Sequence, residues 1–156
     1  MRNSVAAIAL IGREENGKRV WLARWNINGN AYSFVGGHKD PGESFRDCLI
    51  RRVGEELGLE ADADFLLGEE PHSHLEYVGW SEGPRAQTAY TMELYEVTLT
   101  GDFSLDKIDS DNQNRWLEPG EIKSAATKDG KPVSATMNLL MEMAGLFDDN
   151  PPDSVE

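Results

Sequence analysis

The segment from Gly36 to Leu59 constrains the fold most, because it places a Gly-Gly pair, a Pro-Gly loop and a helix in a fixed order. Ser44 and Asp47, three residues apart, form a capping pair, so we expect a helix to begin at about Phe45. Gly58 stands where a glycine commonly ends a helix. The segment therefore predicts a loop–helix–loop unit.

The sequence on both sides of this unit is typical of β-strands, with buried apolar runs or alternating patterns rich in Thr, Tyr and Val. A last helix is predicted after Ser134, carrying Met137, Leu140, Met141 and Phe147. Strands with few helices predict an α/β protein in which helices cover a mixed sheet. The expected strands lie near Val5–Ile11, Arg19–Trp25, Tyr32–Val35, Leu75–Trp80, Thr88–Leu99 and Arg115–Leu117.

The length of 156 residues corresponds to one domain, which we expect to span residues 1–147. Residues 148–156 are acidic, contain two prolines and are nearly free of apolar side chains, so they are predicted to form a disordered tail. The longest apolar run, Val5–Ile11, is far short of the ~20 residues that span a bilayer.

The net charge of −13 excludes some partners. An acidic surface repels phosphate backbones, so we expect no nucleic-acid polymer and no anionic membrane as a partner. A small anionic substrate is still compatible, because a metal cation can reverse the sign of the charge locally. The single cysteine, Cys48, rules out an intrachain disulfide and a cysteine-rich zinc site, and fits a cytoplasmic location.

The predicted helix carries charged side chains beside its apolar stripe. Arg52, Glu55 and Glu56 fall in one sector at the edge of that stripe, where charges are costly unless they are paired. A divalent cation would relieve the repulsion between the two carboxylates, although a solvated helix end is also compatible with the pattern. The stripe consists of Leu49, Ile50, Val53 and Leu57.

This segment resembles the Nudix box, with the pattern G-x5-E-x7-R-E-U-x-E-E-x-G-U, in which U is a bulky aliphatic residue. Arg52 stands where the pattern has Glu, and every other fixed position matches. The matching residues are Gly37, Glu43, Arg51, Val53, Glu55, Glu56, Gly58 and Leu59.

The resemblance implies an α/β/α sandwich with a central mixed sheet and the box as loop–helix–loop. It also implies hydrolysis of a phosphoanhydride in a nucleoside diphosphate linked to another group, with Mg²⁺ or Mn²⁺. Glu55, Glu56 and the carbonyl of Gly37 would be the metal ligands, and Arg51 would pair with Glu43. The resemblance also allows a homodimer.

A further acidic ligand or base is expected a few residues before Trp116, as in many relatives. Gln113 is the nearest equivalent by spacing, and Asp109 or Asp111 could replace it; we take Asp111 as the candidate metal ligand.

Arg52 leaves two alternatives open, because a guanidinium cannot ligate a cation or act as a base. It can pair with the carboxylates one helical turn away and so fill the place of the metal, or it can hold a substrate phosphate bidentately. We therefore count Arg52 with Glu55 and Glu56 as candidate catalytic residues. A catalytically weak or inactive nucleotide-binding or regulatory module is the alternative function.

Other residues are candidates for substrate binding. Arg24, His38 and Arg85 could contact a phosphate, although surface salt bridges or an exposed loop histidine would explain them equally. Four aromatic residues fit either the core or a stacking platform for a nucleobase: Trp25, Tyr77, Trp80 and Tyr90. The expected partner is a small-molecule nucleotide derivative.

Overall fold

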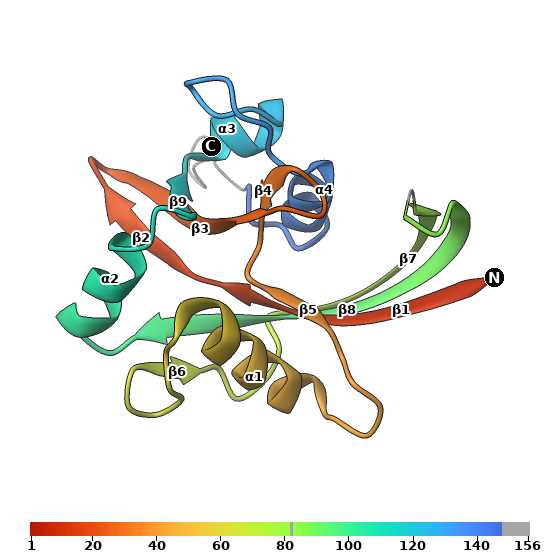
Figure 1. Ribbon diagram of the computed structural model, residues 1–156, viewed down its shortest axis with the longest axis horizontal. Coiled ribbons are helices and arrows are strands. Elements are labelled where there is room, and N and C mark those ends of the chain that lie inside the picture. Colours follow the sequence, from red (N-terminus) through yellow and green to blue (C-terminus); the bar gives the residue numbers. More distant parts are fainter. Residues whose placement is uncertain (82, 148–156) are drawn as a thin grey trace, which may run out of the picture.

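The computed structural model describes residues 1–81 and 83–147, which form two β-sheets with helices on either side (Figure 1). This mixed α/β architecture confirms the predicted fold class. The predicted tail, residues 148–156, lies outside the described residues. No helix in the described part of the chain is long and apolar enough to cross a membrane.

The first sheet is mixed. Strand β8 pairs with β1 in parallel on one edge, and β7 and β6 pair with β8 antiparallel. Strand β5 lies antiparallel to the outer edge of β1, so the Gly-Gly pair runs directly beside that strand. The strands are β1 (Arg2–Leu10), β5 (Gly36–His38), β6 (Phe65–Leu67), β7 (Ser73–Ser81) and β8 (Ala86–Leu99).

The second sheet is antiparallel and is built around β3. Strands β2 and β4 pair with β3 on either half of its length, and β9 pairs with it at Trp21–Arg24. Gly12–Glu15 form β2, and the turn between β2 and β3 is confined to Asn16 and Gly17. The strands are β2 (Gly12–Glu15), β3 (Lys18–Asn26), β4 (Ala31–Ser33) and β9 (Asn114–Leu117).

Four helices occur among the described residues. Helix α1 covers one side of the first sheet, and α3 and α4 lie on the opposite side of the molecule, beside the second sheet (Figure 1). Helix α2 lies at one end, next to β9. The helices are α1 (Phe45–Leu57), α2 (Asp102–Asp109), α3 (Pro119–Ser124) and α4 (Ala135–Met143).

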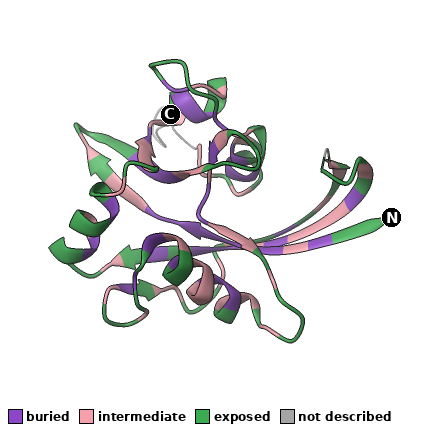
Figure 2. Cartoon of the chain, in the orientation of Figure 1, coloured by how far each residue is buried: buried purple, intermediate pink, exposed green. Residues whose placement is uncertain are grey.

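Strand β1 divides the interior into two hydrophobic cores, because its side chains alternate between the two faces of the sheet. One face, with Ile8 and Leu10, packs against the second sheet and α4. The other face, with Ala7 and Ala9, packs against α1 and α2. Both faces are therefore apolar, which explains the continuous apolar run in the sequence and the buried centre of the molecule (Figure 2).

Helix α1 begins and ends where the sequence predicts. The Ser44 hydroxyl accepts a hydrogen bond from the Asp47 backbone N–H at 3.0 Å. Gly58 ends the helix in the left-handed conformation, with φ of 69°, which glycine adopts without steric cost.

The buried stripe of α1 differs in one position from the prediction. Cys48 is buried and Ile50 is only half-buried. The buried face is rotated toward β5, because the Cys48 thiol packs against the carbonyls of Gly37 and His38, with sulfur–oxygen distances of 3.5 Å. On the same side of the helix, Arg52 lies on Gly37 and Glu56 forms a hydrogen bond with the Gly36 backbone.

Several elements differ from the sequence prediction. The strand expected at Tyr32–Val35 ends at Ser33, because the chain there leaves β3 and crosses to β1, where the Val35 carbonyl accepts a hydrogen bond from the Ala9 backbone N–H at 2.9 Å. Helix α4 ends at Met143, so Phe147 lies beyond it, although Phe147 still packs against the first core. Helices α2 and α3 and strand β6 were not predicted.

Candidate active site

A cleft of about 500 Å³ brings the Gly-Gly strand and α1 together with β3 and the residue before β9. Strand β5 contributes Gly37 and His38, α1 contributes Arg52 and Glu56, and β3 contributes Arg24. The pairing of β3 with β4, and the short step from β4 to β5, bring residues from both sheets to the same opening. The remaining lining residues are Trp25, Asn26, Ile27, Asn28, Ser33, Phe34, Gly36 and Gln113.

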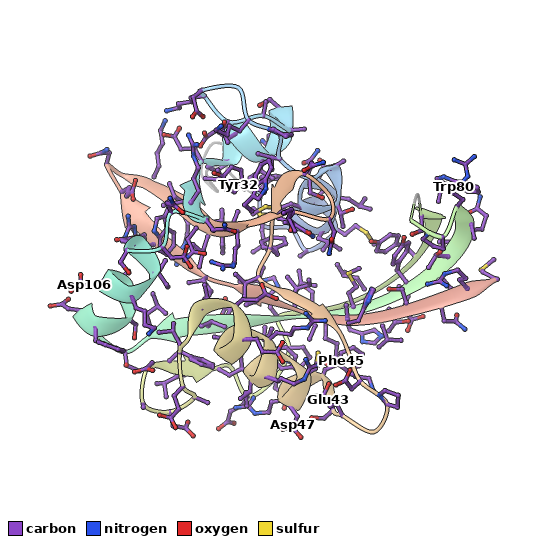
Figure 3. The ribbon with its side chains drawn as sticks, viewed as in Figure 1. Tyr32, Glu43, Phe45, Asp47, Trp80 and Asp106 are labelled. Carbon is purple, nitrogen blue, oxygen red and sulfur yellow. The ribbon has the colours of Figure 1, made fainter. Side chains whose placement is uncertain are left out.

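The loop before α1 is fixed to the helix by an ion pair. The Arg51 guanidinium donates two hydrogen bonds to Glu43, from Nε at 2.7 Å and from a terminal nitrogen at 3.0 Å. These hydrogen bonds hold the pKa of Glu43 well below its usual range, at about 2. Glu43 lies at the start of α1 beside Phe45 and Asp47 (Figure 3), and the pair confirms the contact that the resemblance implies.

Arg52 packs directly on Gly37. A Cβ atom placed on Gly37 would lie 2.6 Å from Cζ and 2.7 Å from Nε of Arg52, so only glycine leaves room for the guanidinium in this position. Arg52 Nε is buried and has no hydrogen-bond partner. A terminal nitrogen lies 3.8 Å from a Glu56 carboxylate oxygen, which is an ion pair too long for a hydrogen bond.

Glu56 is the carboxylate of the cleft. Its side chain is 24% exposed, and burial raises its pKa, against the charges of Arg52 and Arg24 and a hydrogen bond with the Gly36 backbone. Glu55 is 54% exposed, does not line the cleft, and pairs with Arg51 at 3.3 Å. Consecutive helical residues point about 100° apart, so the two carboxylates face different surroundings.

Arg24 is held in the cleft from the side of β9. Its guanidinium donates hydrogen bonds of 2.9 Å to the side chains of Asp111 and Asn114. Asp111 also accepts a hydrogen bond from the Gln113 backbone N–H, and both contacts lower its pKa. Asp111 itself does not line the cleft, whereas Gln113 does.

Of the two other predicted phosphate-binding residues, one lines the cleft and one does not. His38 lines the cleft and its Nε2 lies 3.2 Å from the Ser4 hydroxyl. Arg85 lies in the turn before β8 and does not line the cleft.

Of the four candidate stacking residues, Trp25 alone lines the cleft. Tyr77 and Tyr90 stack on each other, with ring centroids 4.8 Å apart, and Trp80 lies toward the end of β7 (Figure 3).

The donor set does not fit a divalent cation held by the protein alone. Glu56 is one carboxylate in a cleft that also contains two guanidinium groups. The carbonyl of Gly37, which was an expected ligand, accepts a hydrogen bond from the Cys48 thiol at 3.5 Å. Within residues 1–81 and 83–147, no group of three or more His, Cys, Asp or Glu side chains is arranged to hold a metal ion. Hard cations are held mainly by carboxylate oxygens, and the lining of this cleft offers one carboxylate beside two guanidinium groups.

One wall of the cleft carries no signal in the local sequence. Asn26 is the last residue of β3, and Ile27 and Asn28 begin the turn between β3 and β4. The local pattern contained no signal for this role, because the turn reaches the cleft only through the pairing of β3 with β4.

Comparison with known proteins defines the class. Residues 2–137 match the NUDIX domain family, and the chain therefore belongs to the Nudix hydrolase family. Among solved structures, the Ap4A hydrolase of C. elegans aligns with a TM-score of 0.59 at 20% identity, covering 94% of this chain and 98% of that protein. NrtR of Shewanella oneidensis, solved with a 27mer DNA, aligns with a TM-score of 0.58 at 15% identity, covering 90% and 59%. These structures establish the similarity of the fold.

Sequence relatives are more similar over shorter stretches. The NAD-capped RNA hydrolase NudC of Pseudomonas fluorescens Pf-5 is 39% identical over 106 residues, which are 62% of this chain and 37% of NudC. An uncharacterized Nudix hydrolase of Nostoc is 24% identical over 80% of this chain and 70% of its own length. The chain thus spans little more than a third of the NudC that it matches.

Proposed function

We propose that the protein hydrolyses a phosphoanhydride bond in a nucleoside diphosphate linked to another group. One observation carries this proposal: the box residues Gly37, Arg52 and Glu56 share a cleft with Arg24. Two guanidinium groups beside one carboxylate make the cleft locally cationic on a chain of net charge −13. Arginine binds phosphate oxygens bidentately, so this cleft suits a diphosphate.

The proposed roles follow from position. Arg24 and Arg52 bind and orient the phosphates and stabilise the negative charge that develops in the transition state. Glu56 accepts a proton from the attacking water, whose oxygen forms the new bond to phosphorus while the bridging P–O bond breaks. His38, at the rim of the cleft, contacts a phosphate oxygen, and Trp25 offers a ring for the base.

Glu55, Asp111 and Arg85 are weaker candidates than the sequence indicated. Glu55 pairs with Arg51 outside the cleft, and Asp111 positions Arg24. Arg85 does not line the cleft.

Nudix enzymes generally depend on a divalent metal ion, and Mg²⁺ or Mn²⁺ is the cofactor that the family implies. The roles above need no step through such an ion, because the cleft carries arginine side chains where further oxygen ligands are needed. Activity measured with Mg²⁺, with Mn²⁺ and with EDTA tests this point directly.

The deciding experiment is turnover of a panel of nucleotide derivatives by the purified chain, with Glu56→Gln beside it. We expect hydrolysis of at least one diphosphate-containing compound and its loss in Glu56→Gln. Glu142→Gln is the matched control, because Glu142 is exposed on α4, away from the cleft. Absence of turnover over the whole panel under all three metal conditions would refute the proposal.

A catalytically weak or inactive nucleotide-binding module is the second candidate, and Arg52 favours it. Arginine replaces an acidic group of the box and cannot act as a base. Binding of nucleotides without turnover would establish this alternative.

A small-molecule nucleotide derivative remains the proposed partner. NudC is named as a hydrolase of NAD-capped RNA and NrtR was solved with DNA, but a net charge of −13 opposes a long contact with a phosphate backbone. A homodimer and a cytoplasmic location stay predictions, and light scattering during gel filtration tests the first of them.

A further inference from the structure

We propose that the Arg52 guanidinium, lying on Gly37 and acting with Arg24, binds the diphosphate group of the ligand without a divalent cation. The inference rests on the proposed function, because the ligand is the diphosphate of that substrate class. In this chain, two arginine side chains would bind the phosphates, a role that a divalent metal ion has in the family.

The position of Arg52 is the first support. The resemblance assigns a metal to the carbonyl of Gly37, and the Arg52 guanidinium covers Gly37 so closely that a Cβ atom would overlap it. Positive charge is therefore present beside Gly37 in the protein itself.

The charge balance is the second support. Arginine in place of glutamate makes the box more positive by two charges, which equals the charge of one Mg²⁺ ion. The cleft with Arg52 and no metal therefore carries the same formal charge as the usual box with one bound divalent cation. The positive charge needed to neutralise the phosphates is therefore present both in the usual box with its metal ion and in this box with Arg52 alone.

The incomplete pairing of Arg52 is the third support. Its Nε is buried without a hydrogen-bond partner, and its ion pair with Glu56 spans 3.8 Å. A guanidinium in a partly buried cleft loses free energy when its donors are unpaired. The Arg52 side chain is 29% exposed and lines the cleft, so phosphate oxygens entering it would supply strong acceptors for the accessible part of the guanidinium.

Arg24, on β3, supplies the second cation of the cleft. Its hydrogen bonds to Asp111 and Asn114, each 2.9 Å, fix the guanidinium at the cleft before any ligand enters. A guanidinium that is already held in place loses little conformational entropy on binding, which favours affinity.

Titration calorimetry with inorganic pyrophosphate tests the inference, with one series in EDTA and one in Mg²⁺. We expect binding in EDTA that is at least as tight as in Mg²⁺, because the metal complexes pyrophosphate and reduces its charge. Binding that appears only with Mg²⁺ would overturn the inference.

Variants identify the residue responsible. Arg52→Gln should weaken binding in EDTA roughly 10- to 100-fold, the loss expected for one charged hydrogen-bonding partner. Arg19→Gln is the matched control: Arg19 also forms a 3.8 Å ion pair, with Glu14, but lies outside the cleft, and its loss should leave the affinity unchanged. Equal affinities of Arg52→Gln and the natural protein in EDTA would refute the role of Arg52.

One further variant guards against a failure to fold. Arg52→Lys keeps the charge and the side-chain stem, so it tests the same role if Arg52→Gln fails to fold; we expect affinity between those of Arg52→Gln and the natural protein. Failure of the proposed function would appear as metal-free pyrophosphate binding without turnover of any substrate. Failure of the inference alone would appear as turnover with binding that depends on Mg²⁺.

Discussion

Replacing Gly36 by alanine should destabilise the protein far more than the same change at the adjacent Gly37. Gly36 has φ of +141°, a backbone conformation that residues with a Cβ atom rarely adopt. A Cβ atom there would lie 2.3 Å from the carbonyl oxygen of Ala7 and 3.0 Å from Cα of Ile8, both in the backbone of β1. The clash can be relieved only by moving β5 away from β1.

Two contributions determine how much the Gly36→Ala substitution lowers the free energy of unfolding. Backbone strain at such a position costs roughly 1–3 kcal/mol, and overpacking of a buried region costs about the same again. The sum, about 2–6 kcal/mol, is a large part of the 5–15 kcal/mol that typically separates folded from unfolded domains. For a chain of this size, each kcal/mol lowers the melting temperature by roughly 2–4 °C.

The same substitution at the adjacent Gly37 serves as the comparison for Gly36→Ala. Its added Cβ atom meets the end of the Arg52 side chain, which can swing aside, and the freedom that alanine removes from the unfolded chain offsets part of the cost. We expect a change in unfolding free energy of about 1 kcal/mol or less, together with weaker pyrophosphate binding, because Arg52 must leave its position on Gly37.

Urea denaturation followed by circular dichroism measures both variants under one set of conditions. Gly36→Ala within about 1 kcal/mol of the natural protein would show that β5 is not packed on β1 as the structure describes. Gly37→Ala with unchanged pyrophosphate affinity would refute the contact between Gly37 and Arg52 as a determinant of binding.

Three other predictions test the fold around the site. Glu43→Gln should lower the melting temperature at pH 7, because the ionised Glu43 carboxylate pairs with Arg51 and stabilises the fold. The depressed pKa of Glu43 means that this stabilisation is lost as the pH falls from about 4.5 toward 2, so the difference between the two proteins should shrink over that range. Thermal melts of both proteins at pH 7 and near pH 2 measure the difference. Phe65→Ala, at a fully buried position, should cost roughly 3–5 kcal/mol in urea denaturation, whereas Leu66→Ala, half exposed beside it, should stay within about 0.5 kcal/mol. The Cys48 thiol, which is buried and has a raised pKa, should react with a thiol reagent only after unfolding; rapid labelling of the native protein would contradict its placement in the core.

Elements whose signals are local could be predicted from the sequence. Helix α1 was predicted to begin at Phe45 and end before Gly58, because both ends are set by nearby residues. Helix α2 was missed because its first turn has no side-chain cap and Ile108 is its one buried large apolar residue. Strand β6 is only three residues long and exists through its pairing with β8, which no local pattern reveals.

The candidate site was also predicted only in part. The cleft is lined by five of the predicted residues: Gly37, His38, Arg24, Arg52 and Glu56. The motif alone could not show which side of α1 faces it, because that depends on how the helix is rotated against β5.

Arg24 and Asp111 show that the role of a charged residue depends on its partner in the structure as well as on its residue type. From the sequence, an arginine suits a phosphate and an aspartate suits a metal, so the two received separate roles. In the structure the carboxylate accepts a hydrogen bond from the guanidinium and is thereby committed to holding it at the cleft. An aspartate bound in this way contributes to recognition of an anion rather than of a cation, so the same pair of residues favours a phosphate site. The interpretation of Arg52 changes in the same direction, because it lies on Gly37 and shares the cleft with a second arginine and with Glu56 as the one carboxylate of the lining.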